Sequence, residues 1–208
     1  MNEAPPHLSE TARLSEGKVL NPERMRSVFD AATDRPVVIV LAAGKGTRFG
    51  IEPTCVQRVG GKPLARHSID AFARRYGGPV VCLVHYRQDD VMAALDDDVV
   101  YVHSDDPTGG TAYAAFEAFS VAYLRERNPL LFLTMGDRIV PETVFAGMEA
   151  RHGEDAGDGP RLTLLAARYE PPRHVGKGRL ERDARGRITR IVEQRDIDAS
   201  PDQERKAA

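Results

Sequence analysis

The chain has 208 residues, a hydrophobic content of 41% and a formal net charge of -2 at pH 7. A chain of this size can bury a sizeable core, and its near balance of charges predicts no bulk attraction to nucleic acid or to an anionic membrane. Cys55 and Cys82 lie in no metal-ligand spacing, and no N-terminal apolar segment is long enough for a signal peptide, so we expect a reducing, cytoplasmic setting.

The two ends of the chain differ from its middle. Residues 1–35 are mostly polar, with one possible short helix at 21–32, and predict an extension that covers or tethers the rest of the chain. Residues 199–208 predict a flexible, solvated tail. Between them, residues 36–198 show an alternation of short apolar runs and amphipathic stretches, which predicts one folded domain.

The apolar runs are short, mostly rich in β-branched residues and bounded by glycine, proline or charge. They predict strands at residues 36–43, 79–86, 99–103, 129–137 and 161–169. The intervening stretches predict helices at residues 62–76, 89–95, 111–127 and 141–152, with Pro141 in the first turn of the last one. This alternation predicts an α/β fold of Rossmann-like type, with a mostly parallel sheet and helices on both faces. In such sheets, ligands bind beyond the carboxyl ends of the strands.

The first predicted strand runs directly into the loop "LAAGKGTR". Its glycine spacing matches neither the dinucleotide-binding fingerprint nor the P-loop. Gly44 and Gly46 would let backbone amides face an anion, and Lys45, Thr47 and Arg48 would add donors. On the residues alone, an ordinary strand-to-helix turn with solvated basic side chains is the alternative.

The loop resembles the signature of nucleotidyltransferases that join a nucleoside triphosphate to a sugar 1-phosphate. It is most similar to the uridylyltransferase domain that makes UDP-N-acetylglucosamine. The stretches "GGKPLARHSIDAF", "GGTAYAAFEAF", "LFLTMGDRIVPETV" and "GKGRLERDARGRITRIVEQRD" match the same family in the same order. Because the matches extend over residues 36–198, the resemblance implies that this whole region is a nucleotidyltransferase domain.

The resemblance implies a Mg²⁺-dependent reaction between a nucleoside triphosphate, UTP first, and a phosphorylated sugar, with release of pyrophosphate. Lys45 and Arg48 would be the catalytic cations, and Asp137 would bind the metal. Substrate-binding roles would fall to Leu41, Ala42, Ala43, Gly44, Gly46, Thr47, Thr54, Gly110, Thr111, Met135, Gly136, Gly178 and Glu193. No nucleic acid or membrane partner is expected, and a homo-oligomer is left open.

Several of these residues also fit structural roles. Asp137 suits a turn or a helix cap, and Gly110 with Thr111 suits an ordinary helix start. Gly178 and Glu193 flank a stretch that reads as a simple hairpin, in which Glu193 would be a solvated strand residue. The resemblance, rather than the residues themselves, gives them substrate and metal roles.

The sequence departs from the family at three places. Thr54 falls where the family has a phosphate-binding lysine, and Ser104 or Asp105 falls where the closest relatives read uracil with a glutamine. The chain also ends about where the next sugar-contacting asparagine would occur, as expected for a fragment or a shortened relative. Two hypotheses follow: an enzyme with an open choice of base and acceptor, and a non-catalytic module that binds a nucleotide or nucleotide sugar.

Overall fold

The computed structural model describes residues 18–32, 34–46, 50–106, 110–119, 121, 124, 127–154, 161–168, 170 and 178–192. The chain divides into two compact units, Met1–Thr163 and Leu164–Ala208, and each unit is described by itself. Among the described residues, every helix is too short or too polar to cross a lipid bilayer.

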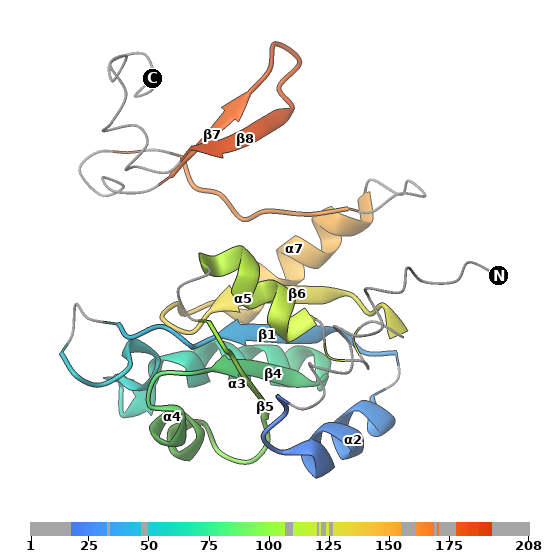
Figure 1. Ribbon diagram of the computed structural model, residues 1–208. Helices are drawn as coiled ribbons and strands as arrows, with labels where there is room; N and C mark the ends of the chain where they lie inside the picture. The colour runs from blue at the N-terminus through green and yellow to red at the C-terminus, as the bar shows by residue number, and fades with distance from the viewer. Residues whose placement is uncertain are drawn as a thin grey trace. The chain divides into compact units, whose positions relative to one another are not determined.

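The first unit is built on a parallel sheet whose strands follow the order β5-β4-β1-β6 (Figure 1). The strands are β1 Val37–Leu41, β4 Val80–Val84, β5 Val100–His103 and β6 Leu131–Met135. They confirm four of the predicted strands and the predicted parallel arrangement. β1 and β4 are buried along their whole length, which explains why both read as unbroken apolar runs.

The helices of the first unit lie between the predicted strands, as expected from the alternation. They are α2 Pro22–Ala31, α3 Leu64–Tyr76, α4 Gln88–Leu95, α5 Gly110–Phe119 and α7 Glu142–Glu154. Smaller elements are the 3-10 helix η2 Thr54–Val56 and the two-residue strands β2 Arg58–Val59 and β3 Lys62–Pro63, which pair antiparallel. Pro141 precedes α7 instead of lying in its first turn, a difference of one residue at a helix boundary.

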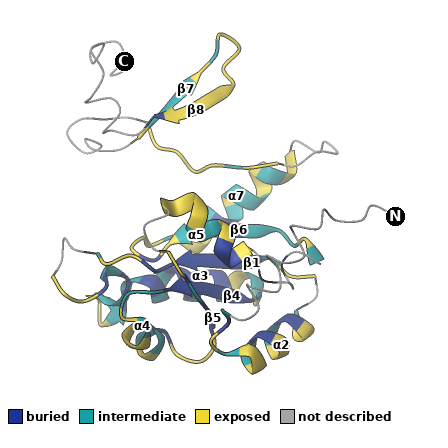
Figure 2. Ribbon diagram, viewed as in Figure 1, coloured by how far each residue is buried: buried dark blue, intermediate teal, exposed yellow. Residues whose placement is uncertain are grey.

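The core has two halves because alternate residues of β1 face opposite sides of the sheet. Val38 and Val40 belong to the half that includes buried residues of α3, α4 and α7. Val37, Ile39 and Leu41 belong to the half that includes buried residues of α2 and α5. Figure 2 shows the buried central strands between these helices. The predicted covering of both faces is therefore confirmed.

The strand predicted at residues 161–169 is wrong. Residues 161–168 adopt no regular structure, and Leu162 and Leu165 are 82% and 67% exposed. An apolar run becomes a strand only where a neighbouring strand supplies hydrogen bonds and a packed face covers its side chains. The described part of the chain supplies neither to this run.

The second unit contains an antiparallel hairpin formed by β7 Arg179–Arg182 and β8 Ile188–Val192. Asp183 organises its turn, because its Oδ1 accepts hydrogen bonds from the amides of Arg185 and Arg187, both at 2.9 Å. Gly186 adopts a φ of 78° in this turn, a conformation that a side chain would strain.

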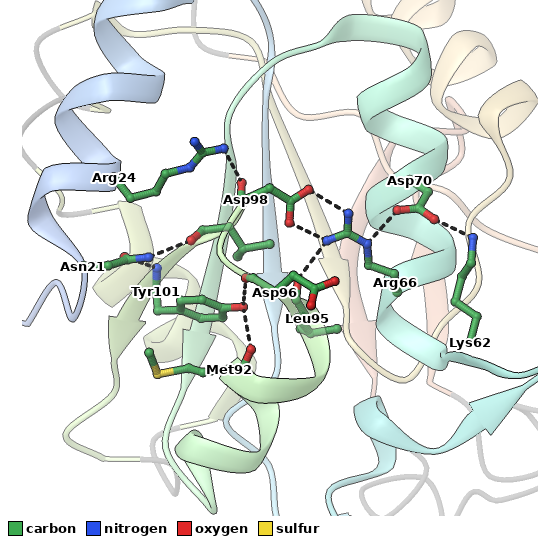
Figure 3. Close-up of polar contacts among 11 residues, drawn as sticks. Asn21, Arg24, Lys62, Arg66, Asp70, Met92, Leu95, Asp96, Asp98 and Tyr101 are labelled. Atoms are coloured by element: carbon green, nitrogen blue, oxygen red, sulfur yellow. Dashed lines mark hydrogen bonds and ion pairs between the residues drawn. The ribbon is translucent and has the colours of Figure 1, made fainter.

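Arg66 of α3 joins several elements near the amino end of β5 (Figure 3). Its guanidinium binds both carboxylate oxygens of Asp98, at 2.5 and 2.7 Å, and donates to the Leu95 carbonyl at 2.8 Å. Its Nε lies 2.7 Å from Asp70, which also accepts a 2.5 Å hydrogen bond from Lys62. The network therefore ties α3 to β3 and to the connection from α4 to β5.

α2 is tied to the same region. The Asn21 side chain donates to the Val99 carbonyl at 2.8 Å and accepts from the Tyr101 amide at 2.9 Å. The buried Tyr101 hydroxyl donates to the Asp96 carbonyl at 2.6 Å. These bonds fix the start of β5 between α2 and α4 (Figure 3), at the opposite end of the sheet from the carboxyl ends of the strands.

Asp70 makes stability depend on pH. Its partial burial raises the pKa of the carboxyl, but the hydrogen bond from Lys62 and the charge of Arg66 outweigh this effect and hold the pKa below its usual value. The ionised form therefore stabilises the fold above about pH 4, and this contribution is lost as pH falls through the folded pKa. We expect Asp70→Asn to lower the free energy of unfolding by about 1 kcal/mol at pH 7. Its urea-denaturation curve should converge with that of the wild type in acid.

Asp34→Asn, which changes an exposed aspartate, is the matched control and should leave the urea midpoint at pH 7 unchanged. A difference between Asp70→Asn and the wild type that stayed constant down to pH 2 would contradict the assignment of this titration to Asp70.

Candidate functional site

The order of the strands in the sheet reverses beside β1. After β1 the chain passes to β4 and then to β5 on one side, and it returns to the other side of β1 for β6. The strand order therefore reverses between β1 and β6, and in α/β sheets the crevice at such a switch point is where ligands bind. The predicted triphosphate loop follows β1, and the predicted metal ligand Asp137 follows β6.

Hydrogen bonds join the carboxyl ends of the two strands. Leu41 and Met135 are opposite each other in the sheet register. The Gly136 amide donates to the Leu41 carbonyl at 2.8 Å, which extends the pairing one residue past β6. On the other side of β1, the Ala42 amide donates to the Leu83 carbonyl at 2.9 Å. The backbone at the start of each loop is therefore held in place by hydrogen bonds of the sheet.

The loop after β1 emerges from the core at Gly44. Ala42 and Ala43 are buried, whereas Gly44 and Lys45 are exposed. The small alanines fit the packed interior, and the exposed glycine leaves its backbone accessible. The loop can therefore present backbone groups and the Lys45 ammonium to an anion.

Gly46 and Thr54 form a close contact within the site. Gly46 has a φ of 58°, and a Cβ atom at this position would collide with the Thr54 hydroxyl. The Thr54 Oγ1 donates to the Gly46 carbonyl at 3.4 Å, from the first residue of η2. A side chain at Gly46 is thus disfavoured by the backbone conformation and by the collision with Thr54. Thr54 also holds the loop through its hydrogen bond to Gly46.

Asp137 lies directly after β6, with its side chain 41% exposed. Its Oδ1 is 3.5 Å from the Nε of Arg138. The preceding Gly136 is closely packed, since a Cβ there would lie 3.0 Å from the Cβ of Cys55 and 3.2 Å from the Leu41 carbonyl oxygen. The Asp137 carboxylate is therefore accessible while its backbone is held against the end of β1.

Cys55 is the nearest thiol to this region, but it is not prepared for catalysis. Burial raises the pKa of the Cys55 thiol to about 11, and the negative charge of Asp137 adds to the effect. A thiol at this pKa is protonated at neutral pH, whereas the thiolate is the nucleophile. Cys55 is therefore a packing residue.

Ser68 of α3 fixes the loop that follows Asp137. Its hydroxyl donates to the Arg138 carbonyl at 2.8 Å and accepts from the Val140 amide at 2.8 Å. Ser68 is 1% exposed. Sequence reasoning missed this residue, although a serine in the otherwise apolar stripe of a predicted helix is a signal that a buried backbone group needs a partner.

We expect Ser68→Ala to lower the free energy of unfolding by about 1–3 kcal/mol, because the Arg138 carbonyl and the Val140 amide both lose their partner. Urea denaturation measures this change. The matched control is Thr134→Ala, whose hydroxyl makes only a 3.5 Å contact with the Met135 carbonyl, and it should cost about 0.5 kcal/mol or less. Equal losses in the two variants would contradict the role of Ser68.

The candidate base-binding turn follows β5. Gly110 and Thr111 begin α5 and are exposed, so the helix starts one residue earlier than predicted. At the end of β5, the Ser104 hydroxyl donates to Glu117 of α5 at 2.5 Å, and the Asp105 amide donates to the same carboxylate at 3.1 Å. Glu117 was not singled out from the sequence, because nothing in its local pattern indicates burial of its charge.

Four other predicted site residues fall outside the described part of the first unit. Thr47, Arg48 and Glu193 lie outside the described residues. Gly178 is exposed and precedes β7 in the second unit. The switch point of the first unit thus brings together Leu41, Ala42, Ala43, Gly44, Lys45, Gly46, Thr54, Met135, Gly136 and Asp137.

Asp137 is the residue that could hold a divalent cation. The described residues contain no group of three or more histidine, cysteine, aspartate or glutamate side chains arranged for a metal. Mg²⁺ is usually held by one or two carboxylates together with water and substrate phosphates, so it needs no such group. An accessible carboxylate next to a candidate phosphate loop fits this cation.

Comparisons with known proteins identify relatives of this chain. The family model described as the MobA-like NTP transferase domain matches residues 38–194. The bifunctional protein GlmU of Halorhodospira halophila is 37% identical over 172 residues, which is 81% of this chain and 33% of that protein. GlmU of Brevibacillus brevis is 31% identical over 165 residues, 76% of this chain and 33% of that protein. The chain spans about a third of the length of these curated relatives.

Among solved structures, HddC from Yersinia pseudotuberculosis is 19% identical, with a TM-score of 0.53 over 76% of this chain and 69% of that chain. At this identity the match shows the fold alone, which is the α/β fold with a mostly parallel sheet. The family model, in contrast, covers most of the sequence, from within β1 to beyond β8. The chain belongs to the MobA-like NTP transferase family.

Proposed function

We propose that this chain is a nucleotidyltransferase that transfers a nucleoside monophosphate from a nucleoside triphosphate to a sugar 1-phosphate or a similar phosphorylated acceptor. The observation that carries the proposal is the pairing of β1 with β6. It holds the glycine loop Gly44–Gly46 and the Asp137 carboxylate on either side of the switch point, through the hydrogen bond from Gly136 to Leu41.

The reaction proceeds by attack of an acceptor phosphate oxygen on the α-phosphorus of the triphosphate. A new phosphorus–oxygen bond forms, the bond to the β-phosphate bridging oxygen breaks, and pyrophosphate leaves with the electron pair. Because the attacking oxygen is already anionic, no protein nucleophile or general base is required. The buried, protonated Cys55 is consistent with this chemistry.

The protein's own contribution is positioning and charge neutralisation. Backbone amides of Gly44 and Gly46 and the side chains of Lys45 and Arg48 bind the triphosphate, and Arg48 can form two parallel bonds to phosphate oxygens. Asp137 would hold Mg²⁺, which would supply neutralisation of phosphate charge. UTP is the first triphosphate to test, and Gly178 and Glu193 are the proposed acceptor contacts.

A second candidate function is favoured by Thr54. Its hydroxyl is bonded to the Gly46 carbonyl, so a neutral group takes the position where the resemblance expects a phosphate-binding lysine. A neutral hydroxyl cannot neutralise a phosphate charge. The alternative is therefore a non-catalytic module of the same family that binds a nucleotide or nucleotide sugar.

The deciding experiment combines UTP, CTP, GTP and ATP with a set of sugar 1-phosphates and Mg²⁺, with pyrophosphate release as the readout. We expect release only when a triphosphate and an acceptor are both present. Arg48→Ala should lower kcat/KM by about 10²-fold, whereas Arg26→Ala, which changes an exposed arginine of α2, should leave it unchanged.

Two results would lead to other conclusions. Nucleotide binding without turnover of any pair would replace the enzyme with the binding module. The absence of both nucleotide binding and turnover would rule out both candidate functions.

A further inference from the structure

The segment before α2 is fixed at the edge of the sheet beside β5. Val19 forms an antiparallel bridge with Val102. The His103 amide donates to the Lys18 carbonyl at 2.8 Å, and the Leu20 amide donates to the Tyr101 carbonyl at 2.9 Å. The backbone of Lys18 is therefore held next to the last residue of β5.

From this position the Lys18 side chain reaches two carboxylates. Its Nζ lies 2.9 Å from Oε1 of Glu117 and 2.6 Å from Oδ2 of Asp105. Glu117 is 3% exposed. It is the one charged residue of α5, whose other residues are glycine, threonine, alanine and aromatic residues. The other Glu117 oxygen accepts from Ser104 at 2.5 Å. The buried Glu117 side chain therefore binds both Lys18 of the N-terminal segment and the residues that follow β5.

Lys18 is the cationic partner of the buried Glu117 side chain. A buried carboxylate without a partner is strongly unfavourable, and removal of one member of a buried pair leaves that penalty in place. Partial burial lowers the pKa of Lys18, but the hydrogen bonds to Asp105 and Glu117 outweigh it and the pKa is raised overall. Lys18 is therefore charged at neutral pH and gives the buried Glu117 side chain a cationic partner.

Glu117 connects the residues that follow β5 to α5, the helix that carries the candidate base-binding residues. Ser104 and Asp105 start the connection from β5 to α5, and Gly110 and Thr111 lie at its far end. Glu117 is two turns further along α5 and binds back to the start of the connection. Glu117 therefore fixes Ser104 and Asp105, at the start of the connection, against α5. Lys18 lies outside residues 38–194, which the family model matches, so the cation comes from a part of this chain that the family does not define.

We propose that Lys18 is a positioning residue for the nucleotide site, and that its ion pair with Glu117 holds Ser104 and Asp105 against α5, the helix that begins with the candidate base contacts Gly110 and Thr111. This inference rests on the proposed function. It assigns to the N-terminal segment a part in nucleotide affinity, in addition to its part in the sheet.

The test compares Lys18→Met, which removes the charge, with Lys18→Arg, which keeps it. Binding of UTP, CTP, GTP and ATP is measured by calorimetry, and hydrogen exchange of residues 110–119 is measured without nucleotide. We expect Lys18→Met to raise the Kd of the best-bound triphosphate about tenfold or more and to speed exchange in α5. Lys18→Arg should stay within about twofold of the wild type on both readouts. In turnover, KM for the triphosphate should rise while kcat changes little.

Two further variants separate positioning from general instability. Lys18→Met/Glu117→Gln removes both charges, so it leaves no buried unpaired carboxylate and should fold even where Lys18→Met does not. It should still show the raised Kd, because the connection has lost its tie to Lys18. Arg66→Met weakens the network at the amino end of β5 and should lower the Tm without changing the Kd.

Unchanged exchange in α5, or an unchanged Kd in Lys18→Met and in the double variant, overturns the inference. A raised Kd in Arg66→Met that matches its loss of Tm also overturns it, because the effect would then follow stability alone. Failure of the wild-type protein to bind any of the four triphosphates removes the proposed function and the inference together, and this result is distinguishable because it is seen without any substitution.

Discussion

Asp137→Asn is expected to lower kcat/KM for nucleotidyl transfer by about 10²- to 10³-fold while leaving the Tm unchanged. The substitution keeps the shape of the side chain and removes its charge, so the proposed Mg²⁺ site loses its anionic ligand. The fold should be unaffected because the side chain is 41% exposed and its ion pair is with the adjacent Arg138. Steady-state assays across a Mg²⁺ titration measure the effect, and the concentration of Mg²⁺ needed for half-maximal rate should rise.

Asp89→Asn is the matched control, since it removes a carboxylate of the same size from the exposed first turn of α4. It should leave both kcat/KM and the Mg²⁺ dependence at wild-type values. Wild-type turnover in Asp137→Asn would show that the carboxylate after β6 does not hold the metal, and the candidate site would have to be reassigned.

Phe72→Ala is expected to lower the free energy of unfolding by about 3–5 kcal/mol. Phe72 is fully buried on α3, and its ring centroid lies 5.9 Å from that of Phe132 in β6 and 5.7 Å from that of Phe145 in α7. The substitution leaves a cavity where these three elements meet. Since small domains have total stabilities of about 5–15 kcal/mol, the loss should be visible as a large shift of the urea midpoint.

Phe119→Ala provides the comparison, because this phenylalanine of α5 is 38% exposed. We expect it to cost about 1 kcal/mol or less, since an exposed ring gives up less buried area. If the two substitutions shifted the urea midpoint equally, the aromatic cluster of α3, β6 and α7 would not be the packing centre that its geometry indicates.

The central sheet could be predicted from the sequence because its strands are buried on both faces. β1 and β4 read as uninterrupted runs of Val, Ile, Leu and Cys, and no amphipathic helix gives that pattern. The failed prediction at residues 161–169 shows the limit of the same reasoning. A short apolar run has strand propensity, but whether it pairs depends on hydrogen-bonding partners that are remote in sequence.

The candidate site was predictable where one short segment carries both its geometry and its chemistry. The glycine loop directly follows the first predicted strand and Asp137 ends the fourth, so strand topology alone brings them to the same edge. Ser68 and Glu117 could not be assigned in the same way. Ser68 binds residues about seventy positions away, and the cation of Glu117 comes from Lys18, ninety-nine positions earlier. No local pattern encodes contacts of that range.

The bridge between Val19 and Val102 also covers part of the outer edge of the sheet. β5 is the outer strand of the sheet, and an uncovered outer strand presents a row of amide and carbonyl groups that another chain can extend into a continuous sheet. The backbone of Lys18 and Leu20 already occupies the groups of Tyr101 and His103 that would start such growth. The segment before α2 therefore protects the protein against self-association through this edge.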